Sequence, residues 1–423
     1  MDPLFVVALV VAIALFFDFT NGFHDTANAM ATPIATGALK PRVAVAIAAV
    51  MNIVGAFLST AVAKTISVDL INSDVQIIPQ MVFAGLTGAI LWNLTTWFLG
   101  LPSSSSHALF GGLIGAAITY SGFNAVNFSK MIEKVFIPAL FAPVIAGVVA
   151  FAATKVAYAL TYRSADAKDV KPTTGRGKFR IGQIFSSSLV ALSHGTNDAQ
   201  KTMGVITLVL VGANLQSSGD YVQTWVIISA ALAIGLGTYS GGWRIIKTMG
   251  TGLSEIRPVQ GLSAETSTGV TILASSNLGF ALSTTQVASG SVIGAGLGRP
   301  GGAVRWNKAG QVVLGWLLTL PAAALVGAAS AALTKFGGDF GLIADGIVTV
   351  AVVVAIFQIS NRNKVAHHNV LDSEVSTAGE VVKTARQRRK EAFAVNQTKK
   401  KSGAKTKSSS SKSSGKTAKK GKK

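Results

Sequence analysis

Charged and hydrogen-bonding side chains interrupt one of the most apolar stretches of this chain. The segment NGFHDTANA at residues 21–29 follows the apolar run at 4–17 and contains His24, Asp25 and Asn28. A carboxylate near the centre of a membrane helix costs about 2.5 to 3.5 kcal/mol on insertion scales. We therefore expect the Asp25 side chain to face an internal cavity or a partner group, and not lipid.

A similar segment recurs near the middle of the chain. GFHD at 22–25 is matched by GTND at 195–198, which aligns Asp25 with Asp198 at an offset of 173. Lys201 and Glu265 are further charged residues in apolar surroundings, and the same cost places their side chains inside the protein. Glu265 has no acidic counterpart in the first half of the chain.

Two runs of hydroxyl side chains could bind a ligand. LPSSSS at 101–106 and LSTTQ at 282–286 each stand directly before a helix rich in Gly and Ala, where Ser and Thr cap first-turn N–H groups. Helix N-termini also carry partial positive charge and free donors, which suit an oxyanion such as phosphate. We assign phosphate binding to Ser103, Ser104, Ser105, Ser106, Ser283, Thr284, Thr285 and Lys201.

An oxyanion beside Asp25 and Asp198 requires positive charge between them, because bare carboxylates in a low dielectric repel an anion. A coupling cation, Na⁺ or a proton, would supply that charge, which is the electrostatic arrangement of a symporter. A sodium ion would lie near the two aspartates, and no other metal site is expected. The residues assigned to coupling are Asp25, Asn28, Asp198, Asn197, Glu265 and His24.

Structural roles stay open for several of these residues. Lys201 stands three residues after Asp198 and can pair with it across one helical turn. The hydroxyl runs can simply tie helices together. Three histidines can be packing groups or proton relays, since histidine titrates nearest neutral pH: His24, His107 and His194.

The composition predicts a membrane protein. The chain has 423 residues, of which 49% are hydrophobic and 13% charged, and its mean hydropathy is +0.48. Apolar stretches near the roughly 20 residues that a bilayer-crossing helix needs recur along 4–360. The N-terminus lacks a basic region and a cleavage site, so we expect the first segment to be retained in a multi-pass protein of the plasma membrane. The absence of cysteine excludes disulfides and thiolate metal sites, and no cofactor is expected.

Basic residues predict the orientation. Lys and Arg concentrate in alternate connections at 38–42, 163–180, 244–257 and 299–308, which should be cytoplasmic and place the N-terminus outside. Much of the net charge of +20 lies in the Lys/Ser-rich tail at 361–423, predicted to be disordered and cytoplasmic, touching anionic lipid and not nucleic acid. The expected spans lie near 4–36 (broken), 43–63, 80–101, 103–119, 132–160, 181–211 (broken), 224–242, 259–281, 283–298, 309–335 and 341–360.

A second internal match defines the fold. The segment at 99–116 resembles that at 278–295 at an offset of 179, so both halves contain the same ordered pair of polar features. Five spans separate the two copies of the Asp segment, and an odd number inverts the second copy. The prediction is an all-α polytopic membrane protein of about 10–12 segments, with discontinuous helices or helical hairpins and two inverted-topology repeats. Its parts are 1–162 (first repeat), 163–180 (basic loop), 181–360 (second repeat) and 361–423 (tail).

These motifs resemble a known family. DFTNGFHDTANAMAT (18–32), LSHGTNDAQKTMGV (192–205), PSSSSHALFGG and LSTTQVASGS are similar to segments of the PiT family of inorganic phosphate transporters. The resemblance covers residues 4–360 and implies a cation-coupled phosphate symporter that is usually dimeric. It carries substrate and cation roles over to Asp25, Asn28, Asp198 and the Ser/Thr caps, and Glu265 matches an acidic family position.

Two departures from the family pattern bear on the coupling ion. His24 stands where sodium-dependent members usually have Asn, and Asn52 where they have Glu. The similarity to bacterial low-affinity members implies proton coupling, with phosphate carried alone or as a neutral divalent-metal complex. The alternatives are a sodium/phosphate symporter, a sulfate permease on the same scaffold and an anion channel. An intramembrane hydrolase is disfavoured, because nothing resembles a nucleophile elbow, so the chain is not expected to be an enzyme.

Overall fold

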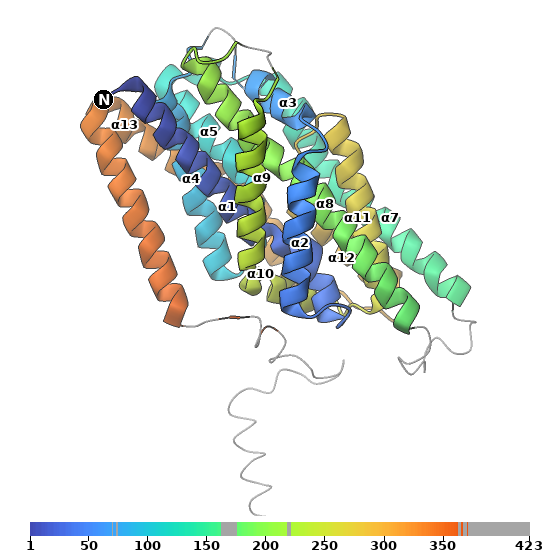
Figure 1. The fold of residues 1–423 in the computed structure, drawn as a ribbon. Helices are drawn as coiled ribbons and strands as arrows, with labels where there is room; N and C mark the ends of the chain where they lie inside the picture. Colours follow the sequence, from blue (N-terminus) through green and yellow to red (C-terminus); the bar gives the residue numbers. More distant parts are fainter. Residues whose placement is uncertain are drawn as a thin grey trace, which may run out of the picture. The chain divides into compact units, whose positions relative to one another are not determined.

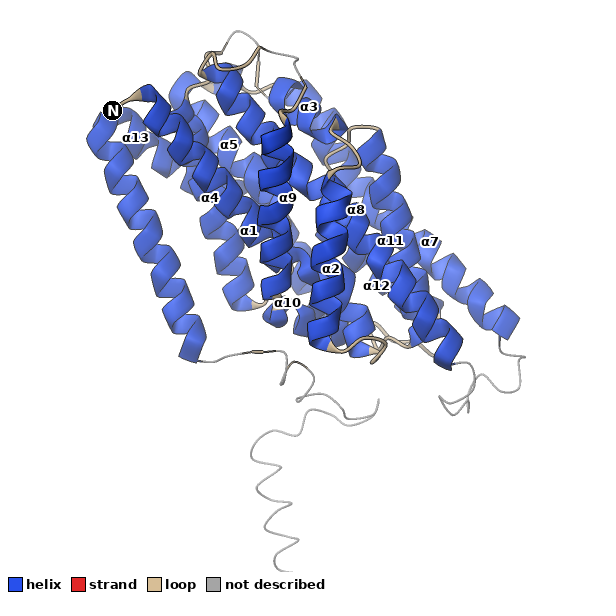
Figure 2. Ribbon diagram, in the orientation of Figure 1, coloured by secondary structure: helices blue, strands red, loops and turns tan. Residues whose placement is uncertain are grey.

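The computed structural model describes residues 1–69, 71–72, 75–161, 176–217, 221–362, 365–366 and 370. These residues are almost entirely helical and contain no β-strand, only two isolated antiparallel bridges (Figure 2). The all-α prediction is confirmed for this part of the chain. The expected tail lies outside the described residues from 371 onward.

The helices follow one another through both halves of the chain (Figure 1). A 3₁₀ turn at Phe123–Ala125 and π-helical turns at Ile132–Phe136 and Thr248–Gly252 connect some of them. Their bounds are α1 Pro3–Ala35, α2 Pro41–Ala56, α3 Ala61–Asp69, α4 Pro79–Leu99, α5 Ser105–Ser121, α6 Phe128–Met131, α7 Ile137–Thr161, α8 Arg176–Gly212, α9 Thr224–Ser240, α10 Trp243–Lys247, α11 Pro258–Asn277, α12 Thr284–Gly298 and α13 Trp306–Arg362.

Proline and glycine set many of the helix ends. Four helices, α1, α2, α4 and α11, begin with proline in the first turn, where its missing N–H is not needed. Helix α4 ends at Gly100, whose φ of 66° lies in the left-handed region that favours glycine. Within α13, Gly338 at φ 54° and ψ −136° breaks the helix, which separates the two spans expected near 309–335 and 341–360.

The two segments expected to be broken are continuous, so that prediction is wrong. Helices α1 and α8 run without interruption through Asp25 and Asp198. The interior positions near Asp25 hold no proline before Pro33, and Gly22 packs against the backbone of Ile234, where a Cβ would lie 2.3 Å from the carbonyl oxygen. The expected basic loop is also too long, because its last five residues, 176–180, belong to α8.

By length and composition, four described helices could cross a membrane, or up to six if each of two bent pairs is one span. This is fewer than the 10–12 segments expected, since α5 and α12 have only 17 and 15 residues and α11 is rich in hydroxyl groups. The spans are Pro3–Ala35, Pro79–Leu99, Phe128–Leu160 and Trp306–Asn361, and the pairs are Pro41–Ala56 with Ala61–Ser67 and Thr224–Ser240 with Trp243–Gly250. These apolar helices indicate a multi-pass membrane protein.

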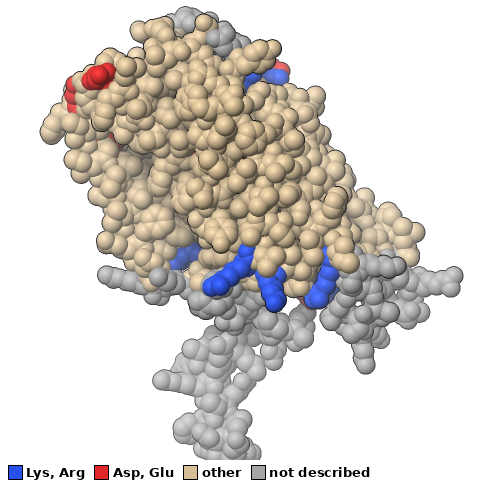
Figure 3. Space-filling view, viewed as in Figure 1, with Lys and Arg blue, Asp and Glu red and all other residues tan. Residues whose placement is uncertain are grey.

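Basic side chains gather at one end of the described helices. In the face drawn in Figure 3, Lys and Arg lie mainly at the end where α2 begins and α10 lies, and the acidic side chains lie at the opposite end. Large apolar side chains of α7 and α13, such as Leu140, Val144, Leu317 and Leu325, are exposed between these ends. This distribution suits a bilayer around the middle of the bundle.

The two serine-led helices pack in matching ways. Helix α5 lies against the first part of α13 through Gly111 and Gly115, where a Cβ would lie 2.4 Å from Leu320 O and 2.0 Å from Ala324 O. Helix α12 lies against α7 through Gly290 and Gly294, where the corresponding distances to Pro143 O and Gly147 O are 2.2 and 1.9 Å. The glycines of the two contacts are related by the offset of 179 seen in the sequence.

A Cβ at Gly294 is expected to destabilise the protein. Gly294→Ala forces α12 and α7 apart, and overpacking of this kind costs about 1–3 kcal/mol. Gly315→Ala is the matched control, because no atom lies within 4 Å of its Cβ position and Ala favours a helix by about 1 kcal/mol over Gly. Thermal unfolding in detergent should show a lower midpoint for Gly294→Ala and an equal or higher one for Gly315→Ala. Equal midpoints for all three proteins would contradict the close packing of α7 and α12.

Candidate functional site

Four helices bring the predicted site residues together. Helix α1 contributes Asp25 and helix α8 contributes Asp198, both from within the helix. The N-termini of α5 and α12 contribute hydroxyl groups. Helices α1 and α8 are antiparallel, since Thr36 contacts Gln183 and Asp25 contacts His194. The two copies of the Asp segment therefore face each other in opposite chain directions.

The Asp25 carboxylate is buried among hydroxyl groups and histidine. Its Oδ2 accepts from Ser105 Oγ at 2.9 Å and lies 3.2 Å from Thr284 Oγ1, and its Oδ1 lies 3.2 Å from Thr285 Oγ1. The neighbouring His24 places Nδ1 2.6 Å from Oδ1. Both hydroxyl runs thus meet at Asp25, although they are far apart in the sequence.

Asp198 and Lys201 form a buried ion pair. The two side chains are 0% and 1% exposed, and the Lys201 ammonium group donates to Asp198 Oδ1. Lys201 Nζ also donates to Ser106 Oγ at 2.5 Å and to the Leu282 carbonyl at 3.0 Å. The helix-turn pairing considered from the sequence is therefore present, and the same ammonium group also reaches both hydroxyl-rich helix starts.

His194 lies between the two carboxylates and is a residue that the sequence-based site assignment missed. Its Nε2 is 2.8 Å from Asp198 Oδ2 and 3.7 Å from Asp25 Oδ2, so this nitrogen lies close to two carboxylate oxygens. The sequence offered two signals: histidine can relay protons, and His194 stands four residues before Asp198, which places both on one helix face.

The other ring nitrogen of His194 also faces an acceptor. Nδ1 lies 3.2 Å from Asn52 Oδ1, and Asn52 Nδ2 donates to Thr238 Oγ1 at 2.6 Å. The Thr238 hydroxyl donates its own proton to the Ile234 carbonyl at 2.8 Å, so it accepts from Asn52, and Asn52 must present oxygen to the ring. The ring of His194 thus lies near side-chain oxygens on both sides, and a cationic imidazole in this place would be attracted by the two carboxylates.

The contacts of one half recur in the other at the offsets found in the sequence, 173 for α1 and α8 and 179 for α5 and α12. Each aspartate contacts the hydroxyl of its own half, and the residue three positions later reaches the hydroxyl of the other half. The corresponding pairs are Asp25 to Ser105 (2.9 Å) and Asp198 to Thr284 (3.1 Å); Asn28 to Thr285 (3.1 Å) and Lys201 to Ser106 (2.5 Å); His24 to Ser103 (3.4 Å) and Asn197 to the Leu282 carbonyl (3.0 Å).

The remaining predicted hydroxyls cap the two helices. Ser104 Oγ accepts from the His107 N–H at 3.2 Å, and Ser283 Oγ accepts from the Gln286 N–H at 3.3 Å. These two serines fill the capping role expected from the sequence. The hydroxyls of the residues that follow them instead donate to the two aspartates and to the Leu282 carbonyl.

Glu265 lies in a separate buried cluster. Its carboxylate accepts from Thr32 at 2.5 Å, Gln183 at 3.0 Å and Ser186 at 2.5 Å, and no basic side chain pairs with it among the described residues. Its contacts come from α1 and α8, which also hold the two aspartates. The assignment of Glu265 to coupling therefore concerns a second group of residues and not the Asp25 cluster.

The central cluster contains polar atoms suited to a small cation. Ligand atoms of Asp25, His194 and Asp198 lie within 4.8 Å of one another. Asn28 Oδ1 and Asn197 Oδ1 are buried without a hydrogen-bond partner among the described residues. Carboxylate and amide oxygens are ligands for hard cations, whereas a cationic imidazole in the same place competes with a metal ion.

Comparison with known proteins identifies the family. A protein of Mycobacterium leprae named "Probable low-affinity inorganic phosphate transporter" is 53% identical over 369 residues, 87% of each chain. A protein of the same name from Bacillus subtilis is 44% identical and covers 78% of this chain and 97% of its own.

A solved structure named "The sodium-dependent phosphate transporter" superposes with a TM-score of 0.69 at 22% identity, over 78% of this chain and 99% of that one. At this identity, the match shows the fold alone. The resemblance seen in the motifs is confirmed, and the family is one of transporters and not of enzymes. Because the family model for phosphate transporters matches residues 21–327, the chain belongs to the phosphate transporter family.

Proposed function

We propose that this protein carries inorganic phosphate across the plasma membrane together with a proton. The observation that carries the proposal is His194, whose two ring nitrogens face the Asp25 and Asp198 carboxylates on one side and Asn52 on the other. A cationic imidazole there supplies the charge that allows an oxyanion to approach two carboxylates. The same proton would then leave with the phosphate on the opposite side.

The charge balance of the cluster explains how a proton and phosphate assist each other. Two carboxylates, the Lys201 ammonium group and a protonated His194 sum to zero, so phosphate meets no net repulsion. Loss of the His194 proton leaves a net negative cluster, which repels phosphate in the low dielectric of the buried site. Binding of each ligand therefore favours binding of the other, as symport requires.

The contacts of two residues favour a proton over sodium. His24 Nδ1 lies 2.6 Å from Asp25 Oδ1, an oxygen that a sodium ion would need as a ligand. Asn52 is neutral and hydrogen-bonded to His194, and so it adds no charge for a second cation. Sodium remains the second candidate, because Asp25 and Asp198 lie close enough to share a cation. In a neutral complex of phosphate with a divalent metal ion, the metal ion would neutralise the phosphate and would be transported with it.

The architecture that we propose for transport is alternating access between two inverted repeats, with the boundaries 1–162 and 181–360. The antiparallel α1 and α8 and the recurring contacts at the site support this arrangement. The gathering of basic side chains at one end supports a cytoplasmic face there and an N-terminus outside. A homodimer is part of the proposal on the resemblance alone.

The deciding experiment compares two gradients in one preparation. Purified protein in liposomes should take up labelled phosphate when an inward proton gradient is imposed, and an equal sodium gradient at constant pH should give little uptake. Excess unlabelled sulfate should compete poorly. Uptake driven only by sodium would reject proton coupling. Sulfate uptake at the same rate as phosphate uptake would favour a sulfate permease. Fast, channel-like phosphate uptake without a proton or sodium gradient would favour an anion channel.

A double substitution tests the site. Asp25→Asn with Asp198→Asn preserves size and most hydrogen bonds but removes both negative charges, and so nothing holds the coupling cation. Proton-driven uptake should fall to the level of empty liposomes. Asp198→Asn also leaves the buried Lys201 without its partner carboxylate, so thermal unfolding must show that the double variant is still folded at the assay temperature. Uptake that persists in the folded double variant would remove the aspartates from the coupling mechanism.

A further inference from the structure

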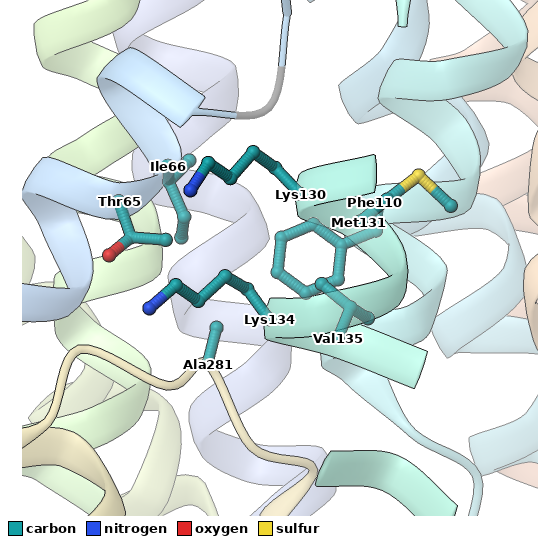
Figure 4. A pocket seen from close by; sticks show the side chains of 8 residues that line it. All are labelled: Thr65, Ile66, Phe110, Lys130, Met131, Lys134, Val135 and Ala281. Atoms are coloured by element: carbon teal, nitrogen blue, oxygen red, sulfur yellow. The ribbon is translucent and has the colours of Figure 1, made fainter. Parts of the chain in front are cut away.

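A second, outer pocket contains two lysines that the transport site does not use. It is a small hollow, open in part to solvent, between α3, the α6 region and the segment before α12. Figure 4 shows the Lys130 and Lys134 ammonium groups directed to the same side of this pocket, toward Thr65 of α3. Two cations directed to one hollow suit an oxyanion.

The charges around this pocket leave a positive excess. Glu133 is the acidic neighbour, and its carboxylate lies 3.5 Å from Lys130 Nζ and 3.6 Å from Lys134 Nζ. Glu133 is 53% exposed, whereas the Lys134 side chain is only 23% exposed and lies over the Phe280 ring, 4.8 Å from its centroid. The pocket therefore retains positive charge that one carboxylate does not cancel.

The pocket adjoins the buried site through a single stretch of backbone. Ala281 lines the pocket, and the next residue, Leu282, directs its carbonyl to Lys201, Asn197 and Ser106. The same stretch is held from the pocket side by Thr65 Oγ1, which donates to the Gly279 carbonyl at 3.0 Å. Residues Ala281 and Leu282 thus connect the lining of the pocket to the contacts of the Lys201 ammonium group.

We propose that Lys130 and Lys134 form an outer binding site that captures inorganic phosphate before residues 280–282 move aside. Helix α3, which lines the site, lies at the end of the bundle opposite α10 (Figure 1), and that end is the outer face under the proposed topology. The inference rests on the proposed phosphate transport. Capture at a positive entrance raises the local concentration of an anionic substrate and so lowers the phosphate concentration needed for transport.

Opposite charge changes should shift the phosphate dependence in opposite directions. Lys134→Gln and Lys130→Gln should each raise the KM for phosphate by about twofold to fivefold, the range for partly exposed charge contacts, with little change in maximal rate. Glu133→Gln should lower the KM, because it removes the competing carboxylate. High salt should weaken the differences among these variants.

The matched control is Lys155→Gln. Lys155 also lies over an aromatic ring, that of Phe151 at 5.0 Å, but it is in the last third of α7, away from the pocket. This variant should keep the wild-type KM. A KM that rises equally in Lys155→Gln would show an effect of total charge and would overturn the site.

The absence of native cysteine allows a second test that does not depend on transport. In Lys134→Cys the only thiol is at the pocket, and inorganic phosphate should slow its reaction with a membrane-impermeant cationic methanethiosulfonate added outside. Restoring the charge with the cationic reagent should restore the low KM, and an anionic reagent should raise it further. Inorganic chloride at equal ionic strength is the control for screening.

The outcomes separate the two proposals. Failure of the wild type to transport phosphate under either gradient overturns the proposed function, and the protection experiment then decides on the pocket alone. Normal transport with an unchanged KM in Lys130→Gln and Lys134→Gln, and no protection of the Lys134→Cys thiol by phosphate, overturns the outer site and leaves the transport mechanism in place.

Discussion

Replacing His194 by Gln is expected to reduce proton-driven phosphate uptake by about tenfold or more. Glutamine can donate to one carboxylate but carries no positive charge, so the pair Asp25 and Asp198 loses the cation between them. A hydrogen bond to a charged group contributes about 1.5–3 kcal/mol, which corresponds to roughly tenfold to a hundredfold in binding. Initial uptake rates in liposomes, measured against the size of the proton gradient, give the effect.

His107→Gln is the control for this variant. His107 is also buried, and it contacts Gln286 at 3.4 Å and neither aspartate. Its replacement should change the rate by less than about threefold, within the range of a neutral hydrogen bond. Equal losses in the two variants would contradict a special role for His194, as would a His194→Gln protein whose uptake still follows the proton gradient.

Replacing Lys201 by Met is expected to destabilise the protein strongly. The Asp198 carboxylate is fully buried, and removing one partner of a buried ion pair leaves an uncompensated charge that costs about 3–5 kcal/mol. The variant also loses the donors to Ser106 and the Leu282 carbonyl, which hold the two hydroxyl-rich helix starts. The loss of stability is measured as the thermal unfolding midpoint in detergent, together with the yield of monodisperse protein after purification.

The double variant Lys201→Met with Asp198→Asn separates folding from function. Neutralising both partners removes the isolated charge, so stability should recover most of the way toward the wild type. Transport should stay absent, because position 198 would no longer hold the coupling proton beside His194. A double variant that is no more stable than Lys201→Met would show that the ion pair is not the source of the loss, and recovered transport would remove Asp198 from coupling.

The sequence was sufficient to predict which motifs meet. The paired aspartates, the hydroxyl runs and Lys201 were assigned from residue type and internal offset, and the structure brings them into one hydrogen-bonded cluster. The prediction succeeded because charged groups in an apolar helix must find internal partners. The capping roles of Ser104 and Ser283 followed from local chemistry, which needs no knowledge of the tertiary fold.

Other features depend on contacts that a single sequence does not reveal. The bridging position of His194 requires the antiparallel register of α1 and α8, which tertiary packing sets. The breaks expected in α1 and α8 are absent: the backbone stays helical through Asp25 and Asp198, whose side chains meet hydroxyl groups of α5 and α12. Glu265 was grouped with the aspartates by its charge and by the family resemblance, whereas its partners are Thr32, Gln183 and Ser186.

The crossed contacts of Asn28 and Lys201 occupy equivalent positions but differ in strength. An amide links α1 to Thr285, whereas an ammonium group links α8 to Ser106 and, through the Leu282 carbonyl, also to the start of α12. One cation therefore contacts the starts of both α5 and α12, and neither helix start can move away from α8 without losing a hydrogen bond to that cation. A change in the charge next to Lys201 would therefore weaken its contacts to Ser106 and to the Leu282 carbonyl together. The Asn28 contact to Thr285 would not change in the same way.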